Sequence, residues 1–204
     1  MRRKKSRAAC EVSERVGKEA ARMTNWYVMR TSPGREEEAL ELIGRTVDRR
    51  LWEQCRILRK KKLFRVDGRL ILNVESMFPG YIFVKTEDPE QLQIELEKSR
   101  EYPKLVGENI SFGKNGLIPV ETEDLAFLKS ICGENLQRTM ELSPVEVDAD
   151  GNITHVAGVL KAYERRIVRK RLRKRYVLAE VPLFHRKERI LFGVCLPGDR
   201  ISTE

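Results

Sequence analysis

The residues of this sequence with the clearest chemical potential form a run of cations near its C-terminus. Eight of the eleven residues from Arg165 to Arg175 are Arg or Lys, and none is acidic. They are Arg165, Arg166, Arg169, Lys170, Arg171, Arg173, Lys174 and Arg175. Guanidinium groups pair bidentately with phosphate and stack on bases, so the run predicts binding to RNA. The alternative is a solvated charged hairpin, which repulsion among like charges disfavours without a polyanion.

The rest of the charge is also unevenly distributed. The chain has 204 residues and a net charge of +9. Residues 1–24 carry eight basic and three acidic side chains, residues 25–141 carry nineteen and twenty, and residues 142–204 carry thirteen and eight. A segregated basic excess favours a polyanionic partner through counterion release. The nearly neutral middle segment is predicted to face another kind of partner.

That middle segment contains an aromatic motif, Phe78-Pro79-Gly80-Tyr81, which runs into the apolar stretch Ile82–Val84. Proline is tolerated only at an edge or a start of a strand, so the flanking aromatic side chains are expected near a surface. Aromatic side chains supply large, rigid contact areas in protein interfaces. The motif therefore predicts a docking surface, with burial of both rings in the sheet core as the alternative.

Several function classes are excluded by the motifs that this sequence lacks. It contains no GxSxG, P-loop or HExxH pattern, so we expect no catalytic residues and no enzyme. The four cysteines form no CxxC pair and there are two histidines, so we expect no metal, no cofactor and no disulfides, only buried or unpaired thiols. No window of about 18 apolar residues and no signal peptide is present, which predicts a soluble, cytoplasmic protein without membrane contact.

The elements that would position the aromatic motif alternate between strands and helices. A strand is predicted at Trp26–Val28, followed by a helix that Ser32 caps and Pro33 begins. The apolar stripe of that helix comprises Leu40, Ile43, Val47 and Leu51. A hairpin is predicted from 57–66 and 69–74 around Asp67-Gly68, with the basic run 59–62 on it. A strand over 78–85, a helix over 89–100 with Leu92, Ile94 and Leu96 inward, and a helix capped by Thr122 with Leu125, Leu128 and Ile131 inward follow.

The C-terminal part is predicted to be a small barrel of short strands. Strands are expected over 156–160, 176–183 and 189–196, with turns at 150–151, 185–187 and 197–198. The predicted organisation is a basic extension over 1–24, an α+β domain over 25–133, a linker over 134–147 and an all-β domain over 148–204. Residues 1–24 are either a disordered basic tail or the product of a start codon assigned too far upstream.

In this order, these motifs resemble the N-terminal (NGN) domain of NusG-type transcription elongation factors over 25–133. The resemblance rests on Trp26–Val28, the helix after Pro33-Gly34, the basic hairpin, Phe78–Val84, Pro103–Gly107 and Ile118–Val120. It implies an antiparallel sheet flanked by helices, followed by a KOW domain, which is an SH3-like barrel. Gly158–Leu160 resembles the KOW glycine and its strand, and Tyr176–Phe184 resembles the central hairpin strand.

The resemblance also implies partners. Members of the family bind the clamp helices of the largest RNA polymerase subunit through an apolar patch, which corresponds here to Phe78 and Tyr81, with Trp26 adjoining. The cation-rich segment resembles the specialised LoaP group, in which the KOW domain recognises a nascent RNA hairpin and promotes read-through of terminators. In general members, the aromatic at Phe184 helps dock ribosomal protein S10. The neighbouring His185–Lys187 departs from the usual Gly-Arg tip, which argues against S10 and against the termination factor Rho.

Two other functions stay open at this point. A general NusG-like elongation factor would make weak, sequence-tolerant RNA contacts. A stand-alone KOW-type RNA-binding protein would have no use for the aromatic surface. The favoured prediction is an antitermination factor that joins RNA polymerase to structured nascent RNA.

Overall fold

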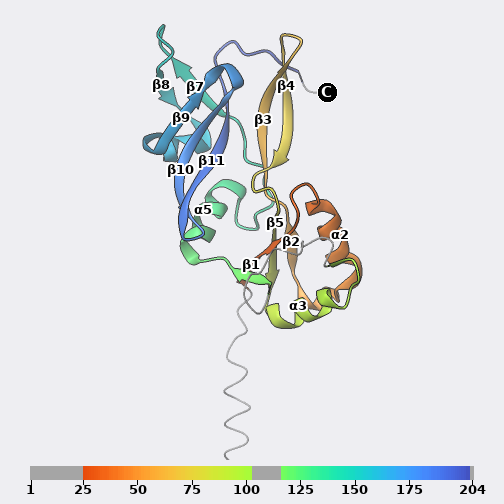
Figure 1. The fold of residues 1–204 in the computed structure, drawn as a ribbon. Coiled ribbons are helices and arrows are strands. Elements are labelled where there is room, and N and C mark those ends of the chain that lie inside the picture. Colours follow the sequence, from red (N-terminus) through yellow and green to blue (C-terminus); the bar gives the residue numbers. More distant parts are fainter. Residues whose placement is uncertain (1–24, 103–115, 203–204) are drawn as a thin grey trace, which may run out of the picture.

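The computed structural model describes residues 25–102 and 116–202 of the chain. The basic segment 1–24 and the Pro103–Gly107 motif lie outside the described residues. Figure 1 shows an N-terminal sheet with helices on one side and a C-terminal sheet beyond α5, with the β3–β4 hairpin standing beside the C-terminal sheet.

The N-terminal sheet has the strand order β2-β5-β1-β6, and all three of its strand pairs are antiparallel. Its strands are β1 (Asn25–Arg30), β2 (Gln54–Arg56), β5 (Tyr81–Thr86) and β6 (Leu117–Pro119). Successive side chains of a strand point to opposite faces, so the sheet contributes to two cores. Met29, Ile82 and Val84 belong to one buried cluster, whereas Trp26, Val28 and Phe83 belong to the other.

Helices α2 (Glu36–Thr46) and α3 (Pro89–Glu97) cover the first face. The predicted helix start at Pro33 and cap at Ser32 are wrong. Residues Ser32 to Arg35 form a turn, in which the Arg35 N–H donates to the Ser32 carbonyl at 3.0 Å. The helix also ends earlier than the apolar stripe suggested, because Val47 adopts extended backbone and Leu51 lies in a separate 3₁₀ turn, η1 (Arg49–Leu51).

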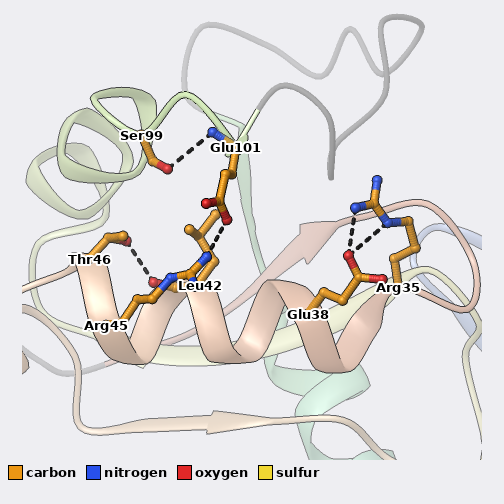
Figure 2. A network of polar contacts seen from close by, with 7 residues as sticks. All are labelled: Arg35, Glu38, Leu42, Arg45, Thr46, Ser99 and Glu101. Carbon is orange, nitrogen blue, oxygen red and sulfur yellow. Dashed lines mark hydrogen bonds and ion pairs between the residues drawn. The ribbon is translucent and has the colours of Figure 1, made fainter.

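Helix α3 is capped by Asp88, whose side chain accepts from the Gln91 N–H at 3.0 Å. Leu92 and Leu96 are buried as predicted, but Ile94 is exposed, so its inward placement was wrong. Figure 2 shows how α2 is joined to the segment after α3: an ion pair links Arg45 to Glu101, whose N–H is held by the Ser99 hydroxyl.

The predicted hairpin is confirmed as β3 (Arg59–Val66) and β4 (Arg69–Ser76). Val66 pairs with Arg69, and the two residues between them, Asp67 and Gly68, both have positive φ angles of 48° and 80°. Those angles are the signature of a type I′ turn, whose twist matches that of the two strands.

Helix α5 (Thr122–Cys132) lies on the second face of the N-terminal sheet and shares its core with the C-terminal sheet. The predicted cap at Thr122 is wrong, because Thr122 is the first helical residue and Glu121 occupies the cap position. Leu128 and Ile131 are buried in one cluster with Phe83 of β5 and Phe192 of the C-terminal sheet. The two parts of the chain therefore pack as one hydrophobic unit.

The C-terminal sheet has the order β8-β7-β11-β10-β9. Its strands are β7 (Ser143–Val147), β8 (Ile153–Val156), β9 (Ile167–Arg171), β10 (Tyr176–Leu183) and β11 (Arg186–Cys195). The predicted strands over 176–183 and 189–196 are thus present. β7 falls within the range expected as a linker.

The strand predicted over 156–160 is wrong beyond Val156, because Gly158–Arg166 forms a 3₁₀ helix, η2. Gly158 has a φ angle of +69°, which turns the chain, and the Leu160 N–H then donates to the Ser143 hydroxyl at 3.1 Å. The outer strands of this sheet order are β8 and β9, so closure into a barrel stays a prediction.

The last described strand, β12 (Ile201–Ser202), returns to the N-terminal part. It pairs in parallel with Leu70 and Ile71 of β4, giving a three-stranded sheet β12-β4-β3. The hairpin is therefore bound on one edge by the end of the C-terminal part.

The thiols of Cys55 and Cys132 are free and buried, and burial raises the pKa of Cys55 to about 12 and that of Cys132 to about 11. Both are protonated near neutral pH. Within residues 25–102 and 116–202, no helix is long and apolar enough to cross a membrane.

Candidate functional site

The aromatic motif forms a turn rather than the start of a strand. The predicted strand over 78–85 begins only at Tyr81, whose N–H donates to the Phe78 carbonyl at 3.1 Å. Gly80 has a φ angle of +81°, and a Cβ at this position would lie 2.8 Å from the Thr31 carbonyl oxygen. Thr31 in turn donates its N–H to the Gly80 carbonyl at 2.9 Å, so the turn is fixed against the end of β1 and requires glycine.

Glu36, the first residue of α2, fastens this turn from the other side. Its buried carboxylate accepts a hydrogen bond from the Gly80 N–H at 2.5 Å. Burial alone raises the pKa of Glu36, but hydrogen bonds from the Gly80, Glu36 and Gly34 N–H groups and the charge of Arg59 outweigh it, so the pKa lies below its ordinary value. The sequence pattern did not assign Glu36 to the site.

Replacement of Glu36 by glutamine is expected to lower the free energy of unfolding at pH 7 by about 1.5–3 kcal/mol, the usual contribution of a charged hydrogen bond. Because the folded-state pKa is depressed, this contribution is present above the ordinary pKa of 4.5 and is lost as the pH falls through the folded value. Urea unfolding across this pH range measures it.

The exposed Glu38, which pairs with Arg35 on the same helix turn, provides the matched control (Figure 2). Glu38→Gln should change stability little, since exposed pairs contribute weakly. Equal effects of the two substitutions, or an effect of Glu36→Gln that persists at low pH, would refute the assignment.

The structure brings the rings of Phe78 and Tyr81 together, with their centroids 6.4 Å apart. A third ring, Phe184 from the β10–β11 turn, lies against both: it stacks on Tyr81 at 6.0 Å with an interplanar angle of 11° and meets Phe78 edge-on at 5.9 Å. Both rings are thus partly buried beneath the C-terminal sheet. Trp26 is 3% exposed and lies in the core behind them.

The position of Phe184 is set by its backbone. Phe184 and His185 both have positive φ angles, 54° and 60°, between the paired residues Leu183 and Arg186. The Phe184 N–H donates to the carboxylate of Asp124 on α5 at 2.9 Å. A turn that sequence analysis placed one residue later thus holds an aromatic side chain over the candidate docking surface.

A second contact between the two parts lies at Gly193 of β11. A Cβ at this position would be 2.3 Å from the Lys61 carbonyl oxygen and 3.2 Å from the Lys62 Cα, both on β3. The backbones of β11 and β3 therefore approach each other too closely for a side chain.

We expect Gly193→Ala to force β11 away from β3 and loosen the contact between the two parts. Hydrogen exchange measured by mass spectrometry should accelerate in β3 and around Phe184. Gly44→Ala, on an open face of α2 with nothing within 4 Å of the added Cβ, is the control and should leave exchange unchanged. Unchanged exchange in Gly193→Ala would show that the close approach is not required.

The predicted cations lie along one edge of the C-terminal sheet. β9 is its outer strand and exposes Arg169, Lys170 and Arg171. The preceding and following segments, the end of η2 and the turn η3 (Leu172–Lys174), expose four more: Arg165, Arg166, Arg173 and Lys174. Seven of the eight predicted cations are therefore presented to solvent from one continuous segment.

Arg175 differs from the other seven. It has a left-handed backbone with φ of 55°, and its guanidinium is held in two hydrogen bonds by Asp199, at 2.7 and 2.5 Å. Burial raises the pKa of Asp199, but the hydrogen bonds from Arg175 and the Leu196 N–H and nearby positive charge outweigh it, so the pKa is lowered. Arg175 thus orients the basic segment and has little free hydrogen-bonding capacity.

The cations of the basic run 59–62 on the β3–β4 hairpin also differ in their burial. Lys60 is 6% exposed, and its ammonium donates to the Ser76 carbonyl at 3.1 Å and lies 3.4 Å from Glu75. Burial lowers its pKa, and the charge and hydrogen bond of Glu75 oppose this only in part. Lys62 lies on the side of the β3–β4 hairpin that faces Tyr176 at the start of β10.

Within 25–102 and 116–202, no group of three or more His, Cys, Asp or Glu side chains is placed to hold a metal ion.

Comparison with known proteins places this geometry in a family. Residues 24–128 match the family model described as transcription termination factor nusG. A solved structure, titled "Domain interaction in Thermotoga maritima NusG", is 19% identical with a TM-score of 0.50, and the match covers 84% of this chain and 94% of that one. At this identity the likeness is one of fold. No curated protein matches significantly.

The family match spans just over half of the chain, and it contains the Phe78–Tyr81 turn and the hairpin. Proteins of this family are transcription factors that bind RNA polymerase. The chain belongs to the NusG family of transcription factors.

Proposed function

We propose that this protein is a transcription antitermination factor of the LoaP type. It binds the clamp helices of RNA polymerase through Phe78, Tyr81 and their apolar surroundings, with Trp26 supporting the surface from the core. It binds a nascent RNA hairpin through the basic segment 165–175 of a KOW domain. Joining the two in one complex promotes read-through of terminators in particular operons, in the cytoplasm.

The observation that carries this proposal is the segment of seven exposed cations on and around β9. Arg169, Lys170 and Arg171 are exposed on an outer strand, and the cations before and after them extend the same positive edge, which suits a phosphate backbone. A factor that acted through polymerase alone would not require this density. In the proposal, Arg175 fixes the segment through Asp199 and the other seven contact RNA.

The domain organisation belongs to the same proposal. The NGN domain spans 25–133, the linker 134–147 and the KOW domain 148–204, whose sheet closes into an SH3-like barrel. His185–Lys187 stands in place of the Gly-Arg tip of general members, so ribosomal protein S10 and Rho form no part of the proposal.

In the structure the C-terminal sheet packs against the N-terminal domain, with Phe184 on Tyr81, and we call this the closed arrangement. Phe184 covers the rings that would contact polymerase, and its N–H is held by Asp124. Docking on polymerase therefore requires the C-terminal sheet to move away. The two contacts then reinforce each other, because a protein tethered to nascent RNA meets polymerase at a high effective concentration.

The test measures binding of the full chain to a hairpin RNA and to an unpaired RNA of the same composition, across a salt series. Affinity that depends on the folded hairpin supports the proposal. Equal, weak affinity for both RNAs would instead assign the protein to general elongation factors. RNA binding without any binding to RNA polymerase would leave a stand-alone RNA-binding protein.

A further inference from the structure

A cleft of about 1040 Å³ lies between the hairpin of the N-terminal domain and the basic segment of the C-terminal part. β3 contributes Lys62, Phe64 and Arg65 to its walls, and the opposite wall includes Arg171, Arg173 and Lys174. None of the described residues that line it is acidic. The cleft thus concentrates positive charge from two domains around one space.

Few of these charges are fully neutralised. Lys62 has a distant carboxylate partner, Glu75, at 3.7 Å, and Arg65 donates to the Gly68 carbonyl at 3.0 Å. Arg171, Arg173 and Lys174 are exposed. Low-dielectric walls lined by charge of one sign focus the field and attract a polyanion. The cleft is therefore suited to phosphate groups.

Two aromatic rings complete the lining. Phe64 is 38% exposed although it is a large apolar side chain, and Tyr176 lies at the start of β10 on the opposite wall. The Lys62 ammonium lies over both rings, 4.4 Å from the Phe64 centroid and 5.8 Å from that of Tyr176. Tyr176 is half-buried. Proteins that bind single-stranded nucleic acids place aromatic rings beside cations, so that bases stack on the rings and phosphates contact the cations.

We propose that this cleft binds unpaired nucleotides of RNA, stacked on Phe64 and Tyr176, with phosphates held by Lys62, Arg65 and the cations of the opposite wall. The inference rests on the proposed function in taking RNA as the ligand, and it adds that the NGN domain supplies half of an RNA site. The stem of the RNA hairpin lies on β9, and the unpaired nucleotides next to that stem enter the cleft.

A site built from two domains couples RNA to their arrangement. Separation of β11 from β3 divides the cleft, so a flank bound there favours the closed state. By reciprocity, polymerase that holds Phe78 and Tyr81 free of Phe184 weakens the flank contact, while the stem remains on the C-terminal sheet. The closed protein is thus the form that samples RNA.

The test compares two RNAs on the full chain, one hairpin alone and the same hairpin with a short unpaired uridine flank. Stacking predicts that the flank raises affinity roughly 5- to 150-fold per stacked base. Phe64→Ala should remove this gain and leave affinity for the bare hairpin unchanged. Val66→Ala, an exposed apolar residue of the same strand that does not line the cleft, should keep both affinities.

A flank carrying 5-iodouridine should crosslink to peptides that contain Phe64 or Tyr176, which locates the contact independently. A deoxyuridine flank with the same gain would support a single-strand site that does not read the sugar. A bare hairpin that binds while its flank adds nothing overturns the cleft and leaves the proposed function standing. A third RNA, the uridine flank without the hairpin, that binds as tightly as the hairpin with its flank would support the cleft and overturn the proposed function.

Discussion

Replacing Phe78 and Tyr81 together by alanine is expected to reduce affinity for RNA polymerase by roughly 100-fold or more. Aromatic residues at the centre of an interface typically cost 2 kcal/mol or more each when truncated. The rings form a pair 6.4 Å apart on a turn that Gly80 and Glu36 fix, so little ordering energy is lost on binding. Biolayer interferometry with core polymerase measures the change.

The closed arrangement makes this experiment more informative. The same substitutions remove the stacking of Phe184 on Tyr81 and should make the closed state less stable. Opening alone would raise polymerase affinity, because a binding-competent state that is rarely populated reduces the apparent affinity. A net loss therefore identifies the rings as direct contacts. Affinity that stays constant or rises would restrict them to an intramolecular role, and the exposed Ile94→Ala on α3 controls for loss of apolar surface.

Removal of Arg165, Arg166, Arg169 and Lys170 should reduce affinity for a hairpin RNA on the order of 100- to 1000-fold at physiological salt. Each cation that neutralises a duplex phosphate contributes about 0.9 to the slope of log K against log salt concentration, so the slope should fall by roughly 3 to 4. These four residues are exposed and do not line the cleft, so the stem contact is tested separately from the flank.

A control with the same loss of charge uses Arg45, Arg50, Lys98 and Arg100, which are exposed on the α2 and α3 side of the N-terminal domain. That variant should keep its affinity and its salt slope nearly unchanged. If both variants lose affinity equally, RNA responds to the overall charge of the protein and β9 is no specific site.

The β3–β4 hairpin is the element that the sequence predicted best, because the two residues of its turn determine its conformation. Asp67 and Gly68 reach positive φ without help from the rest of the chain, and their turn fixes the register of β3 on β4. The helix that begins with Glu36 was less well predicted. Its apolar spacing continues to Leu51, but Val47 leaves the helix to pack into the core in extended backbone.

The 3₁₀ helix η2 shows why long-range contacts defeat pattern analysis. Val159 has high strand propensity, yet the Leu160 N–H donates to the Ser143 hydroxyl, 17 residues away in sequence. A hydrogen bond of this kind leaves no trace in local periodicity. The outer strand β9 was missed for the opposite reason, since its four exposed residues lack any alternation of apolar and polar side chains.

The arrangement around the candidate docking surface could not be predicted from the sequence, because it depends on contacts between distant segments. Phe78 and Tyr81 do lie together, but their partner Phe184 comes from the other domain, and its Asp124 anchor lies 60 residues away in sequence. Trp26 could not be assigned from its type alone, and the structure places it in the core. Arg175 is distinguishable from its neighbours only by its contact with Asp199.

Met140 makes two backbone hydrogen bonds with β3, one to the Lys61 N–H and one to the Arg59 carbonyl, each at 2.9 Å. If these bonds persist when Phe184 leaves the aromatic rings, only Glu141 and Leu142 connect Met140 to β7. Such a linker spans roughly 7–11 Å. The C-terminal sheet would then rotate as a rigid body about a hinge at Met140, next to the β3–β4 hairpin. RNA bound at β9 would then reach the polymerase from one fixed side, because the short connection restricts the positions that the C-terminal sheet can occupy.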